Sequence, residues 1–258
     1  MDLGLEGQRV IVTAGAAGIG LATARAFVRE GARVHVCDVD EAALALLATR
    51  LPQVSRSVCD VSDPAAVDRL FADAQASLGG LDTLVNNAGI AGPTARCEAV
   101  ALADWQRTLE VNLTGAFLCA QRAIPMLKES GNPSIVNLSS VAGRFGYAQR
   151  SPYAATKWGI VGFTKSLSIE LGGFGIRVNA IQPGAVAGDR IDRVVAAKAK
   201  EANVTFEAMR ERYVANASLK RFVEGDDIAN AIVFLASRLG MNISGHALPI
   251  DADLQSLA

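Results

Sequence analysis

The chain has 258 residues, 50% of them hydrophobic, and a formal net charge of -1 at pH 7. This length and composition fit one large α/β domain, or two small ones, with a sizeable core. The sequence has no basic segment for nucleic acid, no apolar run of membrane-spanning length and no N-terminal signal-peptide pattern. We therefore expect a cytoplasmic protein with neither nucleic-acid nor membrane partners.

The cysteines and histidines form no metal-binding or disulfide pattern. The four cysteines are Cys37, Cys59, Cys97 and Cys119. No two of them form a Cys-x-x-Cys motif, and their surroundings are interpreted as apolar. We expect buried free thiols in a reducing compartment. Only His35 and His246 are present, so no metal site is expected. His35 alternates with Cys37 along a predicted strand, and both are interpreted as packing residues.

A glycine-rich turn separates the first predicted strand from the first helix. Arg9–Thr13 is short and rich in β-branched residues, as in a doubly covered parallel strand, and a helical pattern follows over 21–30. Between them, Gly15, Gly18 and Gly20 let the backbone approach a phosphate, which the free N–H groups of a helix N-terminus can bind.

An acidic residue ends the second predicted strand. Asp38 lies 18 residues after Gly20, where a dinucleotide-binding fold places the carboxylate that accepts hydrogen bonds from the adenosine ribose. The same carboxylate would repel a 2′-phosphate, and Ala16, Ala17 and Val39 offer no cation to bind one. The sequence therefore favours NAD over NADP.

Strand and helix patterns alternate along the whole chain. Strands are expected at 9–13, 32–38, 54–59, 81–86, 133–138, 176–181 and 246–250, and helices at 64–78, 152–171 and 225–236 as well as around Asn112. Pro249 predicts an edge position for the last strand. No repeat or linker interrupts this pattern, so residues 1–258 are interpreted as one domain.

Two helices are expected to carry functional side chains. Asn112 stands among apolar neighbours, so we expect it to be buried and hydrogen-bonded. Pro125 is expected to bend this helix or mark its last turns. In the next helix, Ser151 and Pro152 are predicted as the N-cap and the first helical residue.

Tyr153 and Lys157 are spaced to share one face of that helix. A phenol normally has a pKa of about 10, and a nearby ammonium lowers this pKa toward neutrality. A hydroxyl from Ser139 or Ser140, at the end of the preceding strand, would complete a site that removes a proton from an alcohol. Alone, such a pair is more often an amphipathic tyrosine and a solvated lysine.

A polar helical segment at about 186–218 follows the sixth strand. Arginines and lysines are scattered through it. Long insertions at the ligand-binding edge of a sheet commonly cover the ligand, and we expect this segment to be a substrate lid.

These features, in this order, resemble the short-chain dehydrogenase/reductase family over essentially the whole chain. The resemblance rests on Thr13 to Gly20, Asp38, Asp60, Asn86 to Gly89, Asn112, Ser140, Tyr153, Lys157, Pro183 and Gly184. It implies a single-domain Rossmann fold, with a doubly wound parallel sheet of seven strands and helices on both faces. It also implies a homotetramer or homodimer, paired through the long helices and the final strand.

The resemblance implies a catalytic tetrad of Asn112, Ser140, Tyr153 and Lys157. The serine of the family lies 13 residues before the tyrosine, which selects Ser140 over Ser139. Tyr153 is expected to be the general acid/base, and Ser140 to hydrogen-bond the reacting oxygen. Lys157 is expected to lower the pKa of Tyr153 and to bind the nicotinamide ribose. Asn112 is expected to position a water in a proton relay.

The resemblance also implies a set of NAD contacts. They are Gly15, Gly18, Ile19 and Gly20 at the pyrophosphate, Asp38 at the adenosine ribose, Asp60 and Val61 at the adenine, Asn87, Ala88 and Gly89 at the middle of the dinucleotide, Tyr153 and Lys157 at the reacting end, and Pro183, Gly184 and Val186 beside the nicotinamide. Three places depart from the family pattern: Ala14 and Ala252-Asp253 replace usual glycines, and Gly188 replaces a threonine that often binds the carboxamide.

The substrate is expected to lie against the segment between Ser140 and Tyr153. Arg144, Tyr147 and Arg150 make this wall polar, which suggests a polyol, sugar or hydroxy acid, with either arginine on an anionic or hydroxylated end. The alternative, that both arginines are solvated or contact another subunit, stays open.

The expected function is NAD(H)-dependent interconversion of a secondary alcohol and a ketone. An NADP-dependent carbonyl reductase and a non-catalytic dinucleotide-binding regulator are the alternatives.

Overall fold

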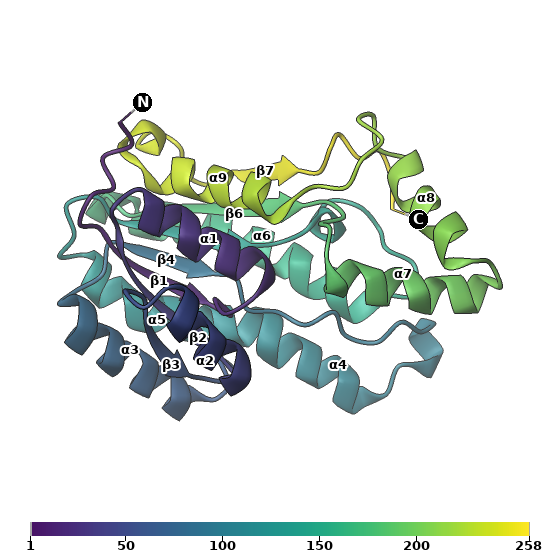
Figure 1. The fold of residues 1–258 in the computed structure, drawn as a ribbon, viewed down its shortest axis with the longest axis horizontal. Coiled ribbons are helices and arrows are strands. Elements are labelled where there is room, and N and C mark those ends of the chain that lie inside the picture. The colour runs from purple at the N-terminus through teal and green to yellow at the C-terminus, as the bar shows by residue number, and fades with distance from the viewer. Residues whose placement is uncertain (1, 258) are drawn as a thin grey trace.

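In the computed structural model, seven strands form one parallel sheet in the order β3-β2-β1-β4-β5-β6-β7 (Figure 1). The structure describes residues 2–257, apart from the side chain of Arg190. The strands are β1 Arg9–Thr13, β2 Arg33–Asp38, β3 Ser55–Val58, β4 Thr83–Asn86, β5 Ser134–Leu138, β6 Arg177–Pro183 and β7 Ala247–Ile250. The predicted Rossmann fold is confirmed, and β7, which contains Pro249, lies at an edge of the sheet as expected.

Helices cover both faces of the sheet (Figure 1). One face carries α1 Gly18–Arg29, α2 Glu41–Arg50 and α9 Gly225–Ala236, and the other carries α3 Pro64–Leu78, α5 Gly115–Leu127 and α6 Ser151–Leu171. The helix α4 Leu102–Leu109 continues into α5 through a π-helical turn, Glu110–Thr114. Among the described residues, none of the helices is both long enough and apolar enough to span a bilayer.

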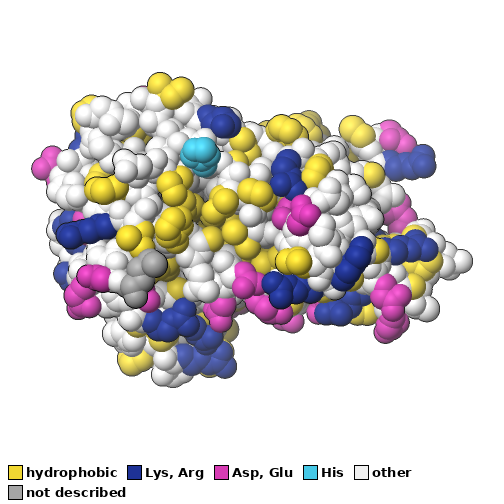
Figure 2. Space-filling view, turned by 90° about the horizontal axis from the view of Figure 1, so that it is seen from above, with side chains coloured by type: hydrophobic (Ala, Val, Ile, Leu, Met, Phe, Trp, Pro, Cys, Tyr) yellow, Lys and Arg dark blue, Asp and Glu magenta, His cyan; other side chains and the backbone are white. Residues whose placement is uncertain are grey.

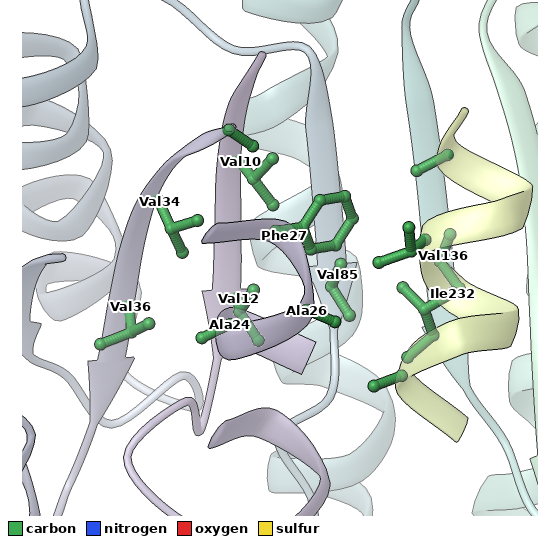
Figure 3. Packing of buried hydrophobic residues seen from close by; sticks show 14 of the residues in the cluster. Val10, Val12, Ala24, Ala26, Phe27, Val34, Val36, Val85, Val136 and Ile232 are labelled. Atoms are coloured by element: carbon green, nitrogen blue, oxygen red, sulfur yellow. The ribbon is translucent and has the colours of Figure 1, made fainter. Parts of the chain in front are cut away.

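The central strand β1 contributes to the cores on both faces of the sheet. Val10 and Val12 pack with Phe27 of α1 and Ile232 of α9 (Figure 3), whereas Ile11 belongs to the opposite cluster. This alternation follows from the two-residue period of a strand. Each such buried aliphatic side chain contributes about 1.5–3 kcal/mol, so the core holds β1 firmly in the middle of the sheet.

Two sequence expectations are wrong. The helix α6 begins one residue earlier than predicted, because Arg150 has the non-helical backbone of an N-cap and its carbonyl accepts from the Ala154 N–H at 2.9 Å. Cys97 is exposed, unlike the other three cysteines, because it lies in the connection after β4 rather than in a core element. Pro125 stands within the last turn of α5, as expected.

The segment expected as a lid forms a helical pair, α7 Asp189–Ala202 and α8 Phe206–Ala215. The two helices share a small apolar cluster that includes Val195, Met209 and Tyr213. They lie beyond the carboxyl end of β7, at one end of the molecule (Figure 1). This position suits a cover for a site at the carboxyl edge of the sheet, and its role as a lid stays a prediction.

His35 of β2 is buried among serines rather than among apolar groups alone. Its Nδ1 lies 2.9 Å from Ser55 Oγ, its Nε2 lies 2.9 Å from Ser57 Oγ, and Ser57 in turn donates to Asp73 at 2.6 Å. Burial lowers the pKa of His35 to about 4, although the nearby Asp73 carboxylate opposes this effect. The folded protein therefore holds the neutral imidazole.

We expect this imidazole to make the protein less stable in acid. The pKa of His35 is lower in the folded chain than its usual value of about 6.5. The contribution of His35 to the free energy of unfolding is therefore complete above pH ~6.5 and is lost as the pH falls toward 4, by up to about 1.4 kcal/mol per pH unit. Urea unfolding at several pH values should show this slope in wild type and in His246→Gln, but not in His35→Gln. An unchanged slope in His35→Gln would contradict the assignment.

Candidate dinucleotide and active site

The ends of β1 and β4 are joined at the point where the strand order reverses. Thr13 Oγ1 accepts from the Asn87 and Ala88 N–H groups, both at 3.0 Å, and the Asn87 amide donates to the Thr13 carbonyl at 2.9 Å and the Ala14 carbonyl at 3.0 Å. Open α/β sheets bind ligands at this reversal. The Asn87 side chain therefore holds the two strand ends together, and Thr13, which belongs to the glycine-rich pattern of the sequence, is its partner.

The glycine-rich turn leaves the start of α1 open to a ligand. A Cβ at Gly20 would collide with the Ala14 carbonyl, and one at Gly15 would lie 2.7 Å from the Val36 side chain. The N-cap residue Ala17 provides no side-chain acceptor for the first N–H groups of the helix. Because these groups have no intrahelical partners, they fit the pyrophosphate of a dinucleotide. The predicted residues Gly18, Ile19 and Gly20 lie here.

The three departures from the family pattern all occur where the backbone has a positive φ. Ala14 has φ +50°, and Ala252 and Asp253 have φ +58° and +56°. The turns that the usual glycines make are therefore kept, at the cost of strain in residues with a Cβ. Gly188, at φ +129°, precedes α7 in a conformation that a threonine would rarely adopt.

Asp38 lies beside the glycine-rich turn. Its two carboxylate oxygens accept from the Ala16 N–H at 3.1 Å and the Asp40 N–H at 3.2 Å. These bonds hold the half-buried carboxylate at the end of β2, next to the start of α1. The position fits a contact with the adenosine ribose.

Asp60 and Val61 follow β3. Asp60 accepts from the Ser62 hydroxyl at 2.7 Å and pairs with Arg107 at 2.7 Å. Burial alone would raise the pKa of Asp60, but the bonds from Ser62 and Arg107 outweigh it and the pKa is lowered. Val61 is buried against Gly115, where a Cβ would lie 2.6 Å from the valine side chain.

Asn112 lies in the π-helical turn between α4 and α5 and is buried, as expected. Its carbonyl oxygen accepts from the Ile90 N–H at 2.7 Å, and its amide donates to the Ile90 carbonyl at 3.0 Å and to Thr156 Oγ1 at 3.1 Å. A π-turn rotates side chains out of α-helical register and is frequent at functional sites. Here it connects the loop after β4 to the helix of Lys157.

Lys157 is buried and held at the end of β5. Its Nζ donates to the Leu138 carbonyl at 2.7 Å and lies 5.6 Å from the centroid of the Tyr153 ring. Ser139 donates to the Lys157 carbonyl at 2.8 Å, whereas Ser140 Oγ accepts from the Ala142 N–H at 3.1 Å. Ser139 thus holds α6 against β5, and Ser140 caps the short 3-10 turn that leads into the segment with Arg144, Tyr147 and Arg150.

The residues expected beside the nicotinamide lie after β6. The Gly184 N–H donates to the Ile250 carbonyl at 2.9 Å, and a Cβ at Gly184 would lie 2.7 Å from the Asp251 Cα. Pro183 is the last residue of β6, and Val186 pairs with Val223 in an isolated bridge. This backbone therefore packs too closely against the C-terminal segment to admit a larger residue at 184.

The three residues expected at the substrate have different surroundings. Arg144 pairs with Asp251 at 2.7 Å and also donates to the Leu254 carbonyl at 3.0 Å. The Tyr147 hydroxyl lies 2.8 Å from that of Tyr213 in α8. Arg150 donates to Thr94 Oγ1 at 3.0 Å and to the Ala91 carbonyl at 2.7 Å. Both guanidinium groups are engaged, and neither is simply solvated.

A cavity of about 360 Å³ lies between the loop after β4 and helix α7. Its lining includes Gly89, Thr94 and Arg150 on one side and Arg193 and Val194 on the other. A Cβ at Gly89 would lie 3.2 Å from Asn112 Oδ1 and 3.5 Å from Lys157 Nζ, so the cavity adjoins the cluster around Lys157.

Known proteins resemble this chain over nearly its full length. The family model described as enoyl-(acyl carrier protein) reductase matches residues 14–253. A 2-(S)-hydroxypropyl-CoM dehydrogenase of Xanthobacter autotrophicus is 34% identical, covering 98% of both chains. A cis-4-hydroxycyclohexanecarboxylate dehydrogenase of Sinomonas cyclohexanicum is 36% identical, covering 95% of both chains. A D-threitol dehydrogenase of Mycolicibacterium smegmatis is 36% identical, covering 97% of this chain and 94% of its own.

Solved structures agree with this relationship. Levodione reductase superposes with a TM-score of 0.89 at 32% identity, covering 96% of this chain and 97% of its own. An actinorhodin polyketide ketoreductase with NADPH superposes with a TM-score of 0.91 at 31% identity, covering 95% and 96%. The chain therefore belongs to the short-chain dehydrogenase/reductase family. It is an oxidoreductase of the class whose members are dehydrogenases and ketoreductases and bind a nicotinamide dinucleotide.

Two residues with notable contacts were not selected from the sequence. Thr156 accepts from Asn112 and donates to the Tyr153 carbonyl at 2.7 Å, although it reads as an ordinary helical residue. Lys198 of α7 is 7% exposed, although its polar segment predicts a solvated side chain. Only the contact between distant elements distinguishes them.

We expect Ala14→Gly to stabilise the protein by about 1 kcal/mol, because glycine removes the cost of a Cβ at φ +50°. Chemical denaturation measures this change. Ala72→Gly, on the exposed surface of α3, is the matched control and should destabilise by about 1 kcal/mol. Equal destabilisation by both substitutions would contradict the assignment of strain to Ala14.

Proposed function

We propose that the protein is an NAD(H)-dependent oxidoreductase that interconverts a secondary alcohol and a ketone. The observation that carries this proposal is the fixed position of Lys157, bonded to the Leu138 carbonyl and 5.6 Å from the Tyr153 ring centroid. A buried ammonium so placed favours loss of the phenolic proton. The cluster lies at the carboxyl edge of the sheet, beside the crevice that fits a dinucleotide.

In this proposal each residue of the tetrad has one task. Tyr153 accepts the hydroxyl proton of the alcohol at its phenolic oxygen, and in the reverse direction it protonates the carbonyl oxygen. Ser140 donates a hydrogen bond to that same oxygen and fixes its position. Lys157 stabilises the phenolate, and Asn112, held by Ile90 and Thr156, orients the path by which the proton reaches solvent. When bound, the nicotinamide ring supplies the hydride chemistry.

We infer that the dinucleotide is NAD rather than NADP. The Asp38 carboxylate stands next to the Ala16 N–H, where it can accept from ribose hydroxyls and would repel a 2′-phosphate. The competing assignment is an NADP-dependent carbonyl reductase, since one structural relative was crystallised with NADPH. That relative does not decide the preference of this chain.

We propose a small polar substrate, covered by the segment 186–218. Two relatives are named for a hydroxycarboxylate and for a sugar alcohol, which supports this class. The wall residues Arg144, Tyr147 and Arg150 are polar, and the Tyr147–Tyr213 hydroxyl contact joins this wall to α8. Closure of the lid would exclude water from the reacting atoms.

We also propose association into a homotetramer or homodimer. Figure 2, a view onto the side of α9 and β7, displays hydrophobic side chains gathered in the middle of that face. Exposed apolar residues in this part of the chain include Phe234, Leu239 and Met241. On α6, Trp158 and Ile169 are 51% and 85% exposed. Burial of such surfaces favours subunit pairing.

We expect Tyr153→Phe to lower kcat for secondary-alcohol oxidation by roughly 10²–10⁴-fold, because the variant loses the group that accepts the proton. NADH binding, measured by fluorescence titration, should persist in the variant. A wild-type protein that binds NADH but oxidises none of a panel of small secondary alcohols would instead support the non-catalytic regulator.

We expect wild type to bind NADH more tightly than NADPH. In Asp38→Ala the ratio of the NADPH and NADH dissociation constants should fall by about tenfold or more, a free-energy change of about 1.4 kcal/mol. Titration of both dinucleotides measures the ratio. Glu129→Ala removes an exposed acid after the last turn of α5 and is the control for the change in net charge. Tighter binding of NADPH by wild type would overturn the NAD assignment.

A further inference from the structure

We propose that Arg150 and Lys198 form a subsite for a carboxylate, so that the substrate is a hydroxy acid with an apolar body rather than a neutral polyol or sugar. This inference rests on the proposed function and deepens it. Arg150, from the segment between Ser140 and Tyr153, and Lys198, from the proposed lid helix α7, would bind the same carboxylate.

The first observation is the place of Arg150 beside the reacting centre. Its guanidinium carbon lies 5.4 Å from the centroid of the Tyr153 ring, and the residue lines the cavity of about 360 Å³. A pocket of this size suits a small substrate. An anionic group held by Arg150 would therefore place the rest of the molecule near the Tyr153 hydroxyl.

The second observation is that Arg150 is a buried charge with neutral partners. The residue is 3% exposed, and its bonds go to Thr94 Oγ1 and the Ala91 carbonyl. Its buried Nε has no hydrogen-bond acceptor, and no carboxylate of residues 2–257 lies within 4.0 Å of its guanidinium nitrogens. Burying a charge without a counterion is costly. A bound anion would compensate this charge.

Arg177 provides an internal comparison, because it is also buried but is fully engaged by the fold. Its guanidinium donates to the Leu235 and Ala236 carbonyls at the C-terminal end of α9, to the Gly240 carbonyl in the turn that follows, and to the Asn132 side chain. The negative end of a helix dipole and four acceptors suit a structural arginine. Arg150 has two acceptors, so up to three of its five N–H donors are available to a ligand.

The third observation is a second cation from the lid. Lys198 is 7% exposed, and its Nζ lies 4.5 Å from the centroid of the Tyr147 ring. Burial lowers the pKa of Lys198, and the positive charge of Arg150 lowers it further, while Glu201 opposes both effects. Both cations lie over the Tyr147 ring, with Arg150 Cζ 5.6 Å and Lys198 Nζ 4.5 Å from its centroid, so the two charges share one buried region. An anion between them would reduce their mutual repulsion and tie α7 to the wall.

The remaining lining of the cavity indicates the class of ligand. Ile90, Ala91, Val194 and Ala197 give it apolar sides, while the buried Arg150 and the exposed Arg193 supply positive charge. A sugar or polyol would leave hydroxyl groups unpaired against the apolar sides. A carboxylate matches the planar guanidinium, and an aliphatic body fits the rest.

The test compares two ligands that cannot react: cyclohexanecarboxylate and cyclohexanecarboxamide. Calorimetric titration of the full chain, with and without NADH, should give at least tenfold tighter binding of the carboxylate. Arg150→Gln and Lys198→Gln should each weaken carboxylate binding at least tenfold and leave the amide unchanged. Lys200→Gln, an exposed charge on the same helix, should stay within twofold of wild type.

Equal affinity of wild type for the two ligands, or full carboxylate affinity in a folded Arg150→Gln protein, would overturn the subsite. If Arg150→Gln does not fold, Lys198→Gln decides, since its charge lies on a different element. Turnover separates the two proposals. Oxidation of cyclohexanol with no preference for 4-hydroxycyclohexanecarboxylate overturns the subsite alone, whereas carboxylate binding without oxidation of any alcohol overturns the proposed function alone.

Discussion

The join between β1 and β4 is the constraint on which the rest of the site depends. Thr13 and Asn87 exchange side-chain and backbone hydrogen bonds across the point where the sheet reverses its strand order. These hydrogen bonds hold the glycine-rich turn and the Asn87–Gly89 loop next to each other at the carboxyl edge of the sheet. The strands are all parallel, but the chain moves outward in one direction from β1 and in the other from β4. A crevice therefore opens between these two strands, and it is where such folds admit a dinucleotide.

The cluster around Tyr153 is built from three segments that meet at this edge. The π-turn presents Asn112 to the loop after β4 and to Thr156 of α6, while Lys157 is bonded to the end of β5. Each polar group is buried, so each must keep its partner, and a shift of one element would cost several hydrogen bonds. Rigid support of this kind positions a proton-transferring group better than a loop could.

The helix α7 and the segment between Ser140 and Tyr153 contribute a different physical element, buried positive charge. Lys198 Nζ lies 4.5 Å from the Tyr147 ring centroid, and Arg150 Cζ lies 5.4 Å from the Tyr153 ring centroid. Of the two cations, Arg150 lines the cavity between the loop after β4 and α7. A cation–π contact offsets only part of the cost of burying the Arg150 charge. This buried charge is the physical basis of the proposed carboxylate subsite.

Local sequence patterns determined most of the fold. The helices Pro64–Leu78 and Gly225–Ala236 match their predicted bounds, because Asp63 with Pro64, and Glu224 with Asp227, are local capping signals. Short β-branched runs likewise marked the strands, whereas α2, rich in leucine and alanine throughout, lacked a clear period and had no predicted bounds. Spacing and family resemblance also brought Asn112, Ser140, Tyr153 and Lys157 forward as candidates. Only the tertiary structure decided the contacts between distant elements: the pairing of Arg144 with Asp251, the serine hydroxyls around His35, and the position of Arg150 and Lys198 over the same Tyr147 ring. No local pattern records such pairs, because burial and charge compensation arise only when separate elements pack together.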